Sequence, residues 1–378
     1  MMHPLVTALF ATGVLALMPF AACAAPPAAP FDLAVDGATP DDTLLTADAR
    51  SVALVQTGEP YTLTLVDRTT HAIAWTKPLP GWAPSPPAFH GDEVLAMLHD
   101  GRLLAFRRAD GNLAWQAQLG AKLFGNALVD GDTLYVGAGH DLLAVDLAAH
   151  SVRWRAPLSP KWNAEAAPVR DGARLYLLVG EDLIALDAAT GAVAWRHPTT
   201  TYAGGDYDAP VLVAGDRVVT GTATKKLVAV AADSGESAWE AAPKNHTWSD
   251  RLVVTPYLFG DRVCFSHVSL STLVEGRDRP SGEFDARATC VDLASGVTRW
   301  SIDLPLGDSP RSAGVAAAAG KLWILHAGKL IGFDPDDGDQ TSLDLPDTFA
   351  KLPSRLAAAD EAGALVLGRG RLAQVRLR

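Results

Sequence analysis

The stretch LIALDAATGAVAWR, from Leu183 to Arg196, shows a pattern that returns about every 40 residues along the chain. An apolar strand is followed by a five-residue turn and then by a tryptophan. A further copy, Asp334 to Ser342, keeps the turn without the tryptophan. The tryptophans that end the other copies, called here the register tryptophans, are Trp75, Trp115, Trp154, Trp195, Trp239 and Trp300. A frame repeated at so constant a period predicts a repeat architecture.

The turn residues of the frame explain why it forms a hairpin. The residue that opens the turn, Asp187 in this copy, lies eight positions before the tryptophan, and Gly191 lies four positions before it. An aspartate here accepts hydrogen bonds from backbone N–H groups two residues on, and glycine adopts the positive φ that other residues resist. Upstream stretches such as Arg174 to Gly180 are rich in apolar residues and follow short turns that contain glycine. Each copy therefore predicts a small antiparallel sheet.

Sheets of this size bury their faces when they are arranged radially and pack against one another. The sequence therefore predicts an all-β fold, an eight-bladed β-propeller of four-stranded antiparallel blades, in preference to a β-sandwich with accidental periodicity. Seven blades come from the frames, and Ala364 to Arg376 supplies strands of an eighth blade that lacks an outer strand. Phe31 to Asp36 is a spare strand candidate. We expect this N-terminal strand to join the C-terminal blade and close the ring.

The start of the chain predicts export. Residues 1–24 contain no Asp, Glu, Lys or Arg, and their apolar run is short for a membrane span. We interpret residues 1–24 as a signal peptide, 25–30 as a leader rich in Pro and Ala, and 31–378 as a single propeller domain. Two fates of Cys23 stay open: removal with the signal, or lipidation at a bacterial lipobox. The expected location is the periplasm, either soluble or anchored by lipid to the outer membrane.

Cys264 and Cys290 remain as an even pair after Cys23 is removed or lipidated, and an exported protein meets an oxidising compartment. In the repeat register Cys264 matches Val219 and Cys290 matches Ala229. The register of the fifth blade places Val219 opposite Ala229 across a hairpin. The alignment therefore predicts that the two cysteines are cross-strand neighbours joined by a disulfide.

Other sequence features favour neither nucleic acid nor a metal. The formal net charge of −11 argues against nucleic acid and against a basic membrane-binding face. The ten histidines show no close pair at metal-ligand spacing. The acidic stretch Asp334 to Asp339 suggests a calcium loop, but Gly338 comes one residue too early for that motif and aligns with Gly191 of the repeat. We interpret the stretch as a blade turn, and we expect no metal and no cofactor.

A second set of aromatic residues falls in the connections between blades. Strand direction alternates within a blade, so these connections and the hairpins between second and third strands share one face of the ring, called here the loop face. The opposite turn face receives the turns of the frame. The insertion at residues 269–285 also falls on the loop face. Because exposed aromatic residues and variation mark binding surfaces, the expected partner-binding residues are Trp82, Trp162, Tyr202, Tyr207 and Trp248. The alternative is that they only pack against the linkers.

The frame APVLVAGDRVVTGTATKKLVAVAADSGESAW, Ala209 to Trp239, resembles the PQQ-like repeat family of eight-bladed propellers. The resemblance covers essentially the whole mature chain. One branch of that family, the quinoprotein dehydrogenases, carries pyrroloquinoline quinone and calcium in the central funnel. Another, the outer-membrane assembly lipoproteins of the BamB type, has about this length and no cofactor. The chain is similar to the second branch, because it lacks the adjacent cysteine pair of the alcohol-oxidising enzymes and a clear acid cluster.

The sequence thus leads us to expect a non-enzymatic periplasmic scaffold. The resemblance implies a protein partner, an outer-membrane assembly component, and contact with a membrane only through a lipid anchor. Two alternatives from other classes remain: an oxidoreductase dependent on pyrroloquinoline quinone, and a secreted propeller that binds glycans through its linker aromatics.

Overall fold

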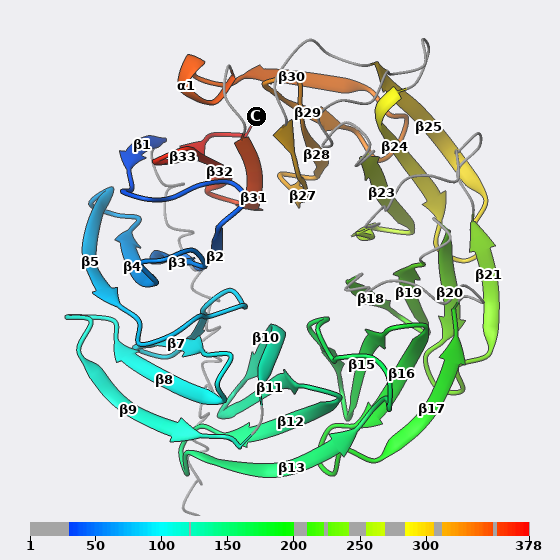
Figure 1. The fold of residues 1–378 in the computed structure, drawn as a ribbon. Helices are drawn as coiled ribbons and strands as arrows, with labels where there is room; N and C mark the ends of the chain where they lie inside the picture. The colour runs from blue at the N-terminus through cyan, green and yellow to red at the C-terminus, as the bar shows by residue number, and fades with distance from the viewer. Residues whose placement is uncertain are drawn as a thin grey trace, which may run out of the picture.

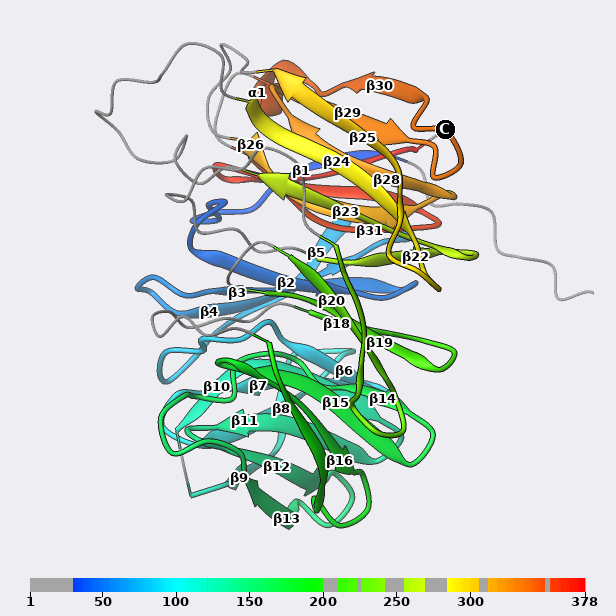
Figure 2. The same cartoon turned by 90° about the vertical axis from the view of Figure 1, so that its right-hand side faces the viewer.

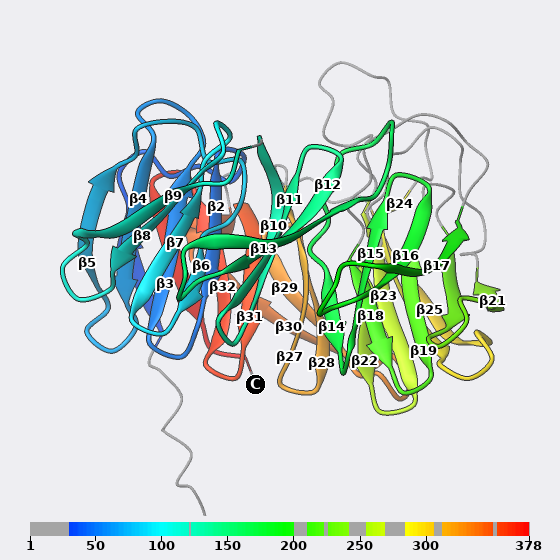
Figure 3. The same ribbon diagram turned by 90° about the horizontal axis from the view of Figure 1, so that it is seen from below.

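The computed structural model describes residues 30–120, 122–199, 210–222, 226–241, 255–268, 284–305, 312–350 and 354–377. The strands of these residues form eight sheets, which stand around a central axis like the blades of a propeller (Figure 1). Seen from the side, the strands of each blade run between the two faces of the ring (Figures 2 and 3). The predicted eight-bladed propeller is therefore confirmed.

Blades 1 to 4 follow the chain in order, each with its first strand innermost. Blade 1 is β2 (Thr43–Ala47), β3 (Ser51–Gln56), β4 (Thr62–Asp67) and β5 (Ala72–Pro78). Blade 2 is β6 (Ala88–His90), β7 (Glu93–Met97), β8 (Arg102–Arg107) and β9 (Leu113–Gln118). Blade 3 is β10 (Leu123–Asp130), β11 (Thr133–Ala138), β12 (Asp141–Asp146) and β13 (Ser151–Pro157). Blade 4 is β14 (Val169–Asp171), β15 (Arg174–Val179), β16 (Asp182–Asp187) and β17 (Val193–Pro198).

Blades 5 to 7 continue the same plan. Blade 5 is β18 (Val211–Ala214), β19 (Arg217–Gly221), β20 (Leu227–Ala231) and β21 (Ser237–Ala241). Blade 6 is β22 (Tyr257–Phe259), β23 (Arg262–Val268), β24 (Phe284–Asp292) and β25 (Thr298–Pro305). Blade 7 is β27 (Val315–Ala318), β28 (Lys321–His326), β29 (Lys329–Phe333) and β30 (Gln340–Asp344), and the short helix α1 (Asp347–Ala350) follows it.

Blade 8 joins the two ends of the chain, as predicted. Its strands are β31 (Ser354–Asp360), β32 (Gly363–Gly368), β33 (Arg371–Val375) and the N-terminal β1 (Phe31–Ala34). β1 pairs antiparallel with β33 and takes the outermost position, and β26 (Ser312–Ala313) pairs parallel with β31 on the inner side. The outer edge of β33 is thereby covered, which removes an unpaired edge next to blade 1.

The hydrophobic core lies between neighbouring blades. One cluster combines Leu95 and Met97 of blade 2 with Leu134 and Val136 of blade 3, all of them fully buried. Equivalent clusters occupy the other junctions, and the middle strands are accordingly apolar on both faces. Each blade is therefore stable only because its neighbours cover it.

The register tryptophans hold these junctions together at the turn face. The Trp154 indole N–H donates a hydrogen bond of 3.1 Å to the Ala188 carbonyl in the next blade's turn. Gly191 of the same turn has φ +73°, and a β-carbon there would lie 2.6 Å from the Trp154 ring. The ring therefore packs directly against the glycine backbone. Glycines in this position meet the preceding tryptophan in the same way at Gly111, Gly235 and Gly296, while at Gly338 a β-carbon would lie 2.7 Å from Ile302 Cδ1 and 3.1 Å from the Trp300 ring.

Two blades carry histidine at the glycine position, and both histidines stack on an aromatic ring. The His150 ring lies 4.1 Å from the Trp115 ring, centroid to centroid. The His71 ring lies 5.3 Å from the ring of Phe31 in β1. Phe31 pairs with Gln374, and this is the strand position that Trp75 takes in blade 1. Phe31 therefore fills the tryptophan position of the eighth blade.

Cys264 and Cys290 form a disulfide between opposite residues of β23 and β24. Their Cα atoms are 4.0 Å apart, and both side chains are fully buried. In blade 5 Val219 pairs with Ala229, which is the register from which the cysteine pairing was predicted.

Candidate functional site

Backbone hydrogen bonds show which turns and loops lie together on each face of the ring. On the turn face of blade 2, Arg108 N donates to Asp92 O at 2.8 Å. This bond joins the turn between the third and fourth strands of the blade to the turn between its first and second strands. On the loop face, Leu119 N donates to Gly101 O at 2.9 Å, which joins the exit of the fourth strand to the hairpin between the second and third. Candidate sites can thus be assigned to one face or the other.

Among the residues that the structure describes, Trp82 is the exposed aromatic residue of the loop face. It lies in the connection between blades 1 and 2, and 41% of its surface is exposed. Its ring lies 4.8 Å from the His99 ring, and the His99 ring lies 4.8 Å edge-on from the Phe124 ring. His99 N also donates to Trp82 O at 2.9 Å. The three rings come from the connection between blades 1 and 2, from blade 2 and from blade 3, and they form one continuous group, called here the aromatic triplet.

Trp162 occupies the equivalent connection between blades 3 and 4 but packs differently. A β-carbon on Gly180 would lie 2.1 Å from the Trp162 ring, so the ring rests on the glycine backbone. It also contributes to the core between blades 3 and 4, and the Lys161 ammonium lies 4.2 Å from its ring centroid. Trp162 is therefore half-buried, and linker packing accounts for much of its surface.

The remaining loop-face candidates lie outside the described residues. These are Tyr202, Tyr207 and Trp248, together with residues 269–283 of the insertion. Cys23, the lipidation candidate, also lies outside them. Among the described residues, the structure brings Trp82 together with His99 and Phe124, two residues that the sequence did not single out.

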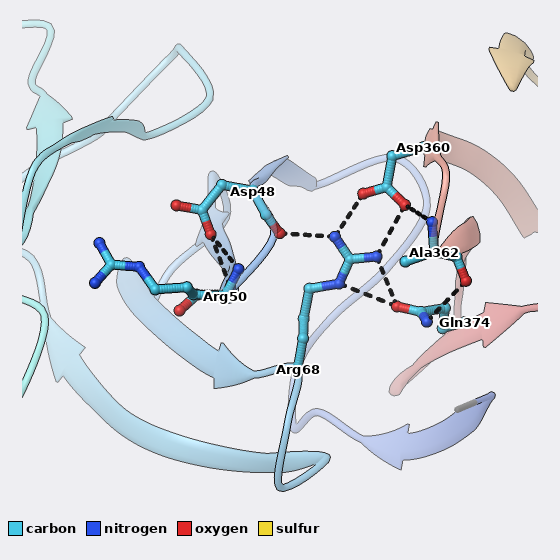
Figure 4. Close-up of polar contacts among 7 residues, drawn as sticks. Asp48, Arg50, Arg68, Asp360, Ala362 and Gln374 are labelled. Atoms are coloured by element: carbon cyan, nitrogen blue, oxygen red, sulfur yellow. Dashed lines mark hydrogen bonds and ion pairs between the residues drawn. The ribbon is translucent and has the colours of Figure 1, made fainter. Parts of the chain in front are cut away.

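A buried arginine network on the turn face was missed by the sequence analysis. Arg68, whose polar contacts Figure 4 shows, follows the residue that opens the blade 1 turn. Its side chain is 1% exposed. Its guanidinium makes a bidentate ion pair with Asp360 of blade 8, and its Nε and Nη2 donate to Gln374 Oε1 at 3.1 and 2.9 Å. Nη1 also donates to Asp48 O at 2.7 Å. Arg68 therefore ties blade 1 to the blade that contains both chain ends.

Arg108 repeats this arrangement one blade further on. It donates to Asp48 Oδ2 at 2.7 Å and to Ser51 Oγ at 3.3 Å, both in blade 1. Its guanidinium also lies 4.1 Å from the centroid of the Phe89 ring. The two arginines thus fill the same position at two consecutive junctions, and Asp48 contacts both of them.

The carboxyl groups of this network have lowered pKa values. Burial pushes the pKa of Asp360 upward, but the hydrogen bonds and positive charge of Arg68 outweigh it, so the pKa lies below its usual range. The same balance between burial and Arg108 lowers the pKa of Asp48. Both groups are therefore held as carboxylates, which pairs the buried guanidinium groups.

The described residues contain no group of three or more His, Cys, Asp and Glu side chains arranged to hold a metal ion. In the acidic stretch, Asp334 and Gly338 form the turn between β29 and β30, where Gly338 N donates to Asp334 O at 2.9 Å. Asp336 of this turn pairs with Arg262. Nor do the described residues include a helix long and apolar enough to cross a membrane.

The ring and its frame define a closed propeller built from a single kind of repeat. The chain belongs to the family described as outer membrane protein assembly factor BamB, whose model matches residues 37–178, 108–284 and 179–377. A search of curated protein sequences finds no match to the chain.

Solved structures from different functional classes share the fold. BamB from Moraxella catarrhalis has a TM-score of 0.66 at 14% identity, with 92% of this chain and 97% of that chain covered. A europium-containing methanol dehydrogenase has a TM-score of 0.63 at 11% identity, with 89% and 83% covered. The computationally designed Ika8 protein has a TM-score of 0.62 at 11% identity, with 90% and 98% covered. Likeness at such low identity concerns the fold alone.

Proposed function

We propose that this chain is a non-enzymatic periplasmic scaffold that binds a protein partner on its loop face, in the assembly of outer-membrane proteins. The family match supports the class of function, since the family is described as an outer membrane protein assembly factor. The observation that carries the binding face is the aromatic triplet, because Trp82 stays 41% exposed beside two further rings on a rigid scaffold. Exposed aromatic residues of this kind are frequent anchors in protein interfaces.

Site-specific photo-crosslinking tests the binding face. A photoreactive phenylalanine analogue at position 82 should crosslink to one envelope protein in living cells. The same analogue at position 113 is the matched control, because Leu113 is 46% exposed but lies on the outer strand β9, away from the loop face. Equal crosslinking at both positions, or none at position 82, would refute binding through the triplet.

The biological role is tested separately by the amount of outer-membrane β-barrel protein in cells lacking the chain. We expect a decrease that the wild type restores, and that a Trp82→Ala, His99→Ala variant restores less well. Full restoration by the variant would refute the aromatic triplet as the binding site while remaining consistent with the scaffold role. Unchanged β-barrel protein levels in the deletion strain would contradict a role in assembly.

A quinone-dependent oxidoreductase is the second candidate, and the fold likeness to a methanol dehydrogenase is the observation in its favour. Adding pyrroloquinoline quinone with calcium should, on our proposal, raise neither the melting temperature nor dye-linked alcohol oxidation. A saturable thermal shift with turnover would overturn the non-enzymatic assignment. The glycan-binding alternative predicts a change in tryptophan fluorescence on adding polysaccharide.

A further inference from the structure

The junctions between blades differ in the side chain that follows the turn-opening residue. This position is called here the junction residue. It is Arg68 between blades 8 and 1, Arg108 between blades 1 and 2, Leu147 between blades 2 and 3, and Ala188 between blades 3 and 4. The two arginines fill their junctions with an apolar stem that ends in a planar cation. Ala188 leaves that volume open.

A cavity of about 310 Å³ occupies the junction between blades 3 and 4. This volume is at the lower end of the range for small-molecule sites, roughly 300 to 1,000 Å³. Tyr135 and Trp154 form its apolar walls together with Ala188. The Tyr135 hydroxyl and the Trp154 indole N–H both donate to Ala188 O, at 3.3 and 3.1 Å. Since the polar atoms of both rings already have this acceptor, the surface that the rings offer to the cavity is apolar.

Two arginines line the same cavity, and both are fixed in position. Arg153 donates to Asp146 Oδ2 at 2.9 and 2.7 Å and to Thr133 Oγ1 at 3.0 Å. Arg170 pairs with Asp130, and its Nε donates to Gly172 O at 3.0 Å. Both side chains are partly exposed, at 46% and 38%. These contacts engage three of the five N–H groups of Arg153 and two of those of Arg170, so each guanidinium keeps donors for a further acceptor.

The arginines come from different positions here than at the junction between blades 1 and 2. There, Asp48 and Ser51 offer acceptors, and the chain supplies the cation from Arg108. Between blades 3 and 4, Asp130 and Thr133 take the equivalent strand positions but already hold Arg170 and Arg153. This junction lacks an apolar stem, and at its rim it offers guanidinium N–H donors, each guanidinium lying beside the carboxylate that pairs with it.

We propose that this cavity binds a small carboxylate with an apolar body, the body lying against Tyr135 and Trp154 and the carboxylate at Arg153 and Arg170. Guanidinium groups held by other contacts suit a carboxylate, because their forked N–H donors match its two oxygens. The site lies on the turn face and is independent of the partner-binding role of the loop face.

Calorimetric titration of the whole protein with benzoate tests the proposal. We expect saturable binding at one site, with a dissociation constant roughly in the millimolar range for so small a ligand. Benzamide has the same shape without the charge and should bind at least about tenfold more weakly. Equal affinity for the two probes would refute the role of the arginines, and no saturable benzoate binding would refute the site.

Two variants locate the binding. Ala188→Leu places in the cavity the side chain that Leu147 supplies one junction earlier, and it should weaken benzoate binding at least about tenfold. Ala232→Leu makes the same change at the next junction and should leave the affinity unchanged. If the Ala188 variant does not fold, Arg170→Gln serves instead, and it should reduce benzoate affinity to that of benzamide. Wild-type affinity in either cavity variant would overturn the proposal.

Discussion

The turn face and the loop face are made by the same repeat, yet their residues obey different constraints. On the turn face, Gly191 must be glycine because the Trp154 ring lies where a β-carbon would be. On the loop face, the same hairpin position is Gly180 in blade 4 and His99 in blade 2. The Trp162 ring packs against the Gly180 backbone, whereas the Trp82 ring lies beside the His99 ring and stays exposed.

The difference shows which contacts stabilise the fold. On the turn face, the contacts of the register tryptophans with the following blade's turn join two blades and recur at most junctions, so a change at one of them weakens a junction. A loop-face residue such as Trp82 contacts side chains that are themselves at the surface. The turn face therefore specifies the ring, and the loop face can vary without loss of the fold.

The largest expected effect is that of deleting Phe31 to Asp36. This removes β1, opens the edge of β33 and takes away the Phe31 contact with His71. The lost burial of Phe31, Leu33 and Val35 alone is worth roughly 5 kcal/mol, comparable to the whole stability of many domains. Circular dichroism should show a much lower melting temperature. Deleting residues 25–30 is the control, and equal melting of the two deletions would mean that the ring closes without β1.

Trp75→Ala should have the next largest effect. The ring is 8% exposed, and its N–H donates to Arg108 O at 2.8 Å, so truncation leaves a cavity and an unpaired carbonyl at the junction. We expect a loss of about 3 to 5 kcal/mol in the free energy of unfolding. Urea denaturation measures it. A loss below about 1 kcal/mol would show that the register tryptophans do not hold the junctions.

Asp360→Asn tests the arginine network and its pH dependence. Because Asp360 is partly exposed, we expect a loss of about 2 kcal/mol at neutral pH, below the usual value for a broken buried pair. The folded-state pKa is lowered, so the wild-type carboxylate stabilises above its unfolded pKa of about 3.9, and this contribution is lost as the pH falls through the folded value. The difference between variant and wild type should therefore shrink below about pH 4.

Asp92→Asn is the control for that measurement, because Asp92 pairs with Arg50 at the surface and its side chain is 86% exposed. It should change the stability by less than about 0.5 kcal/mol. A difference between the Asp360 variant and wild type that persists at acid pH would mean that the charge of Asp360 is not what stabilises the junction.

Trp82→Ala should have the smallest effect on stability, within about 0.5 kcal/mol of the wild type. Trp82 lies seven residues after Trp75 and has the same side chain, so the two variants differ only in face and burial. Thermal melting in parallel makes the comparison. Similar melting temperatures for both would remove the distinction between packing and surface aromatics.

The sequence predicted the fold because the turn and the tryptophan are local. Asp187, Gly191 and Trp195 lie within nine residues, and the other copies keep the same spacing with most of the same residues. The disulfide followed from that register as well. The arginine network did not, because Arg68 meets Asp360 and Gln374 from 292 and 306 residues away, and its position in the turn holds different residue types in different copies.

The aromatic triplet was predicted only in part. The position of Trp82 in a connection indicated the loop face, but its exposure depends on His99, which belongs to the next blade. Phe31 was recognised as strand-forming, while its place at the tryptophan position of the eighth blade was not. The turn of blade 1 is the signal that could have shown it, since the position of His71 faces an aromatic residue of the preceding blade in the other copies, whether it holds glycine or, as at His150, histidine.

The direction of β1 determines which face of the ring lies toward an anchor at the N-terminus. β1 runs from Phe31, beside Gln374 at the turn face, to Ala34, beside Arg371 at the loop face. The N-terminal end of β1, which any preceding segment must join, therefore lies on the turn face. If that segment is anchored to a surface, by lipid or otherwise, the turn face and the cavity between blades 3 and 4 would face that surface. The loop face, with Trp82, would then face away from the surface and stay accessible to a partner on the other side.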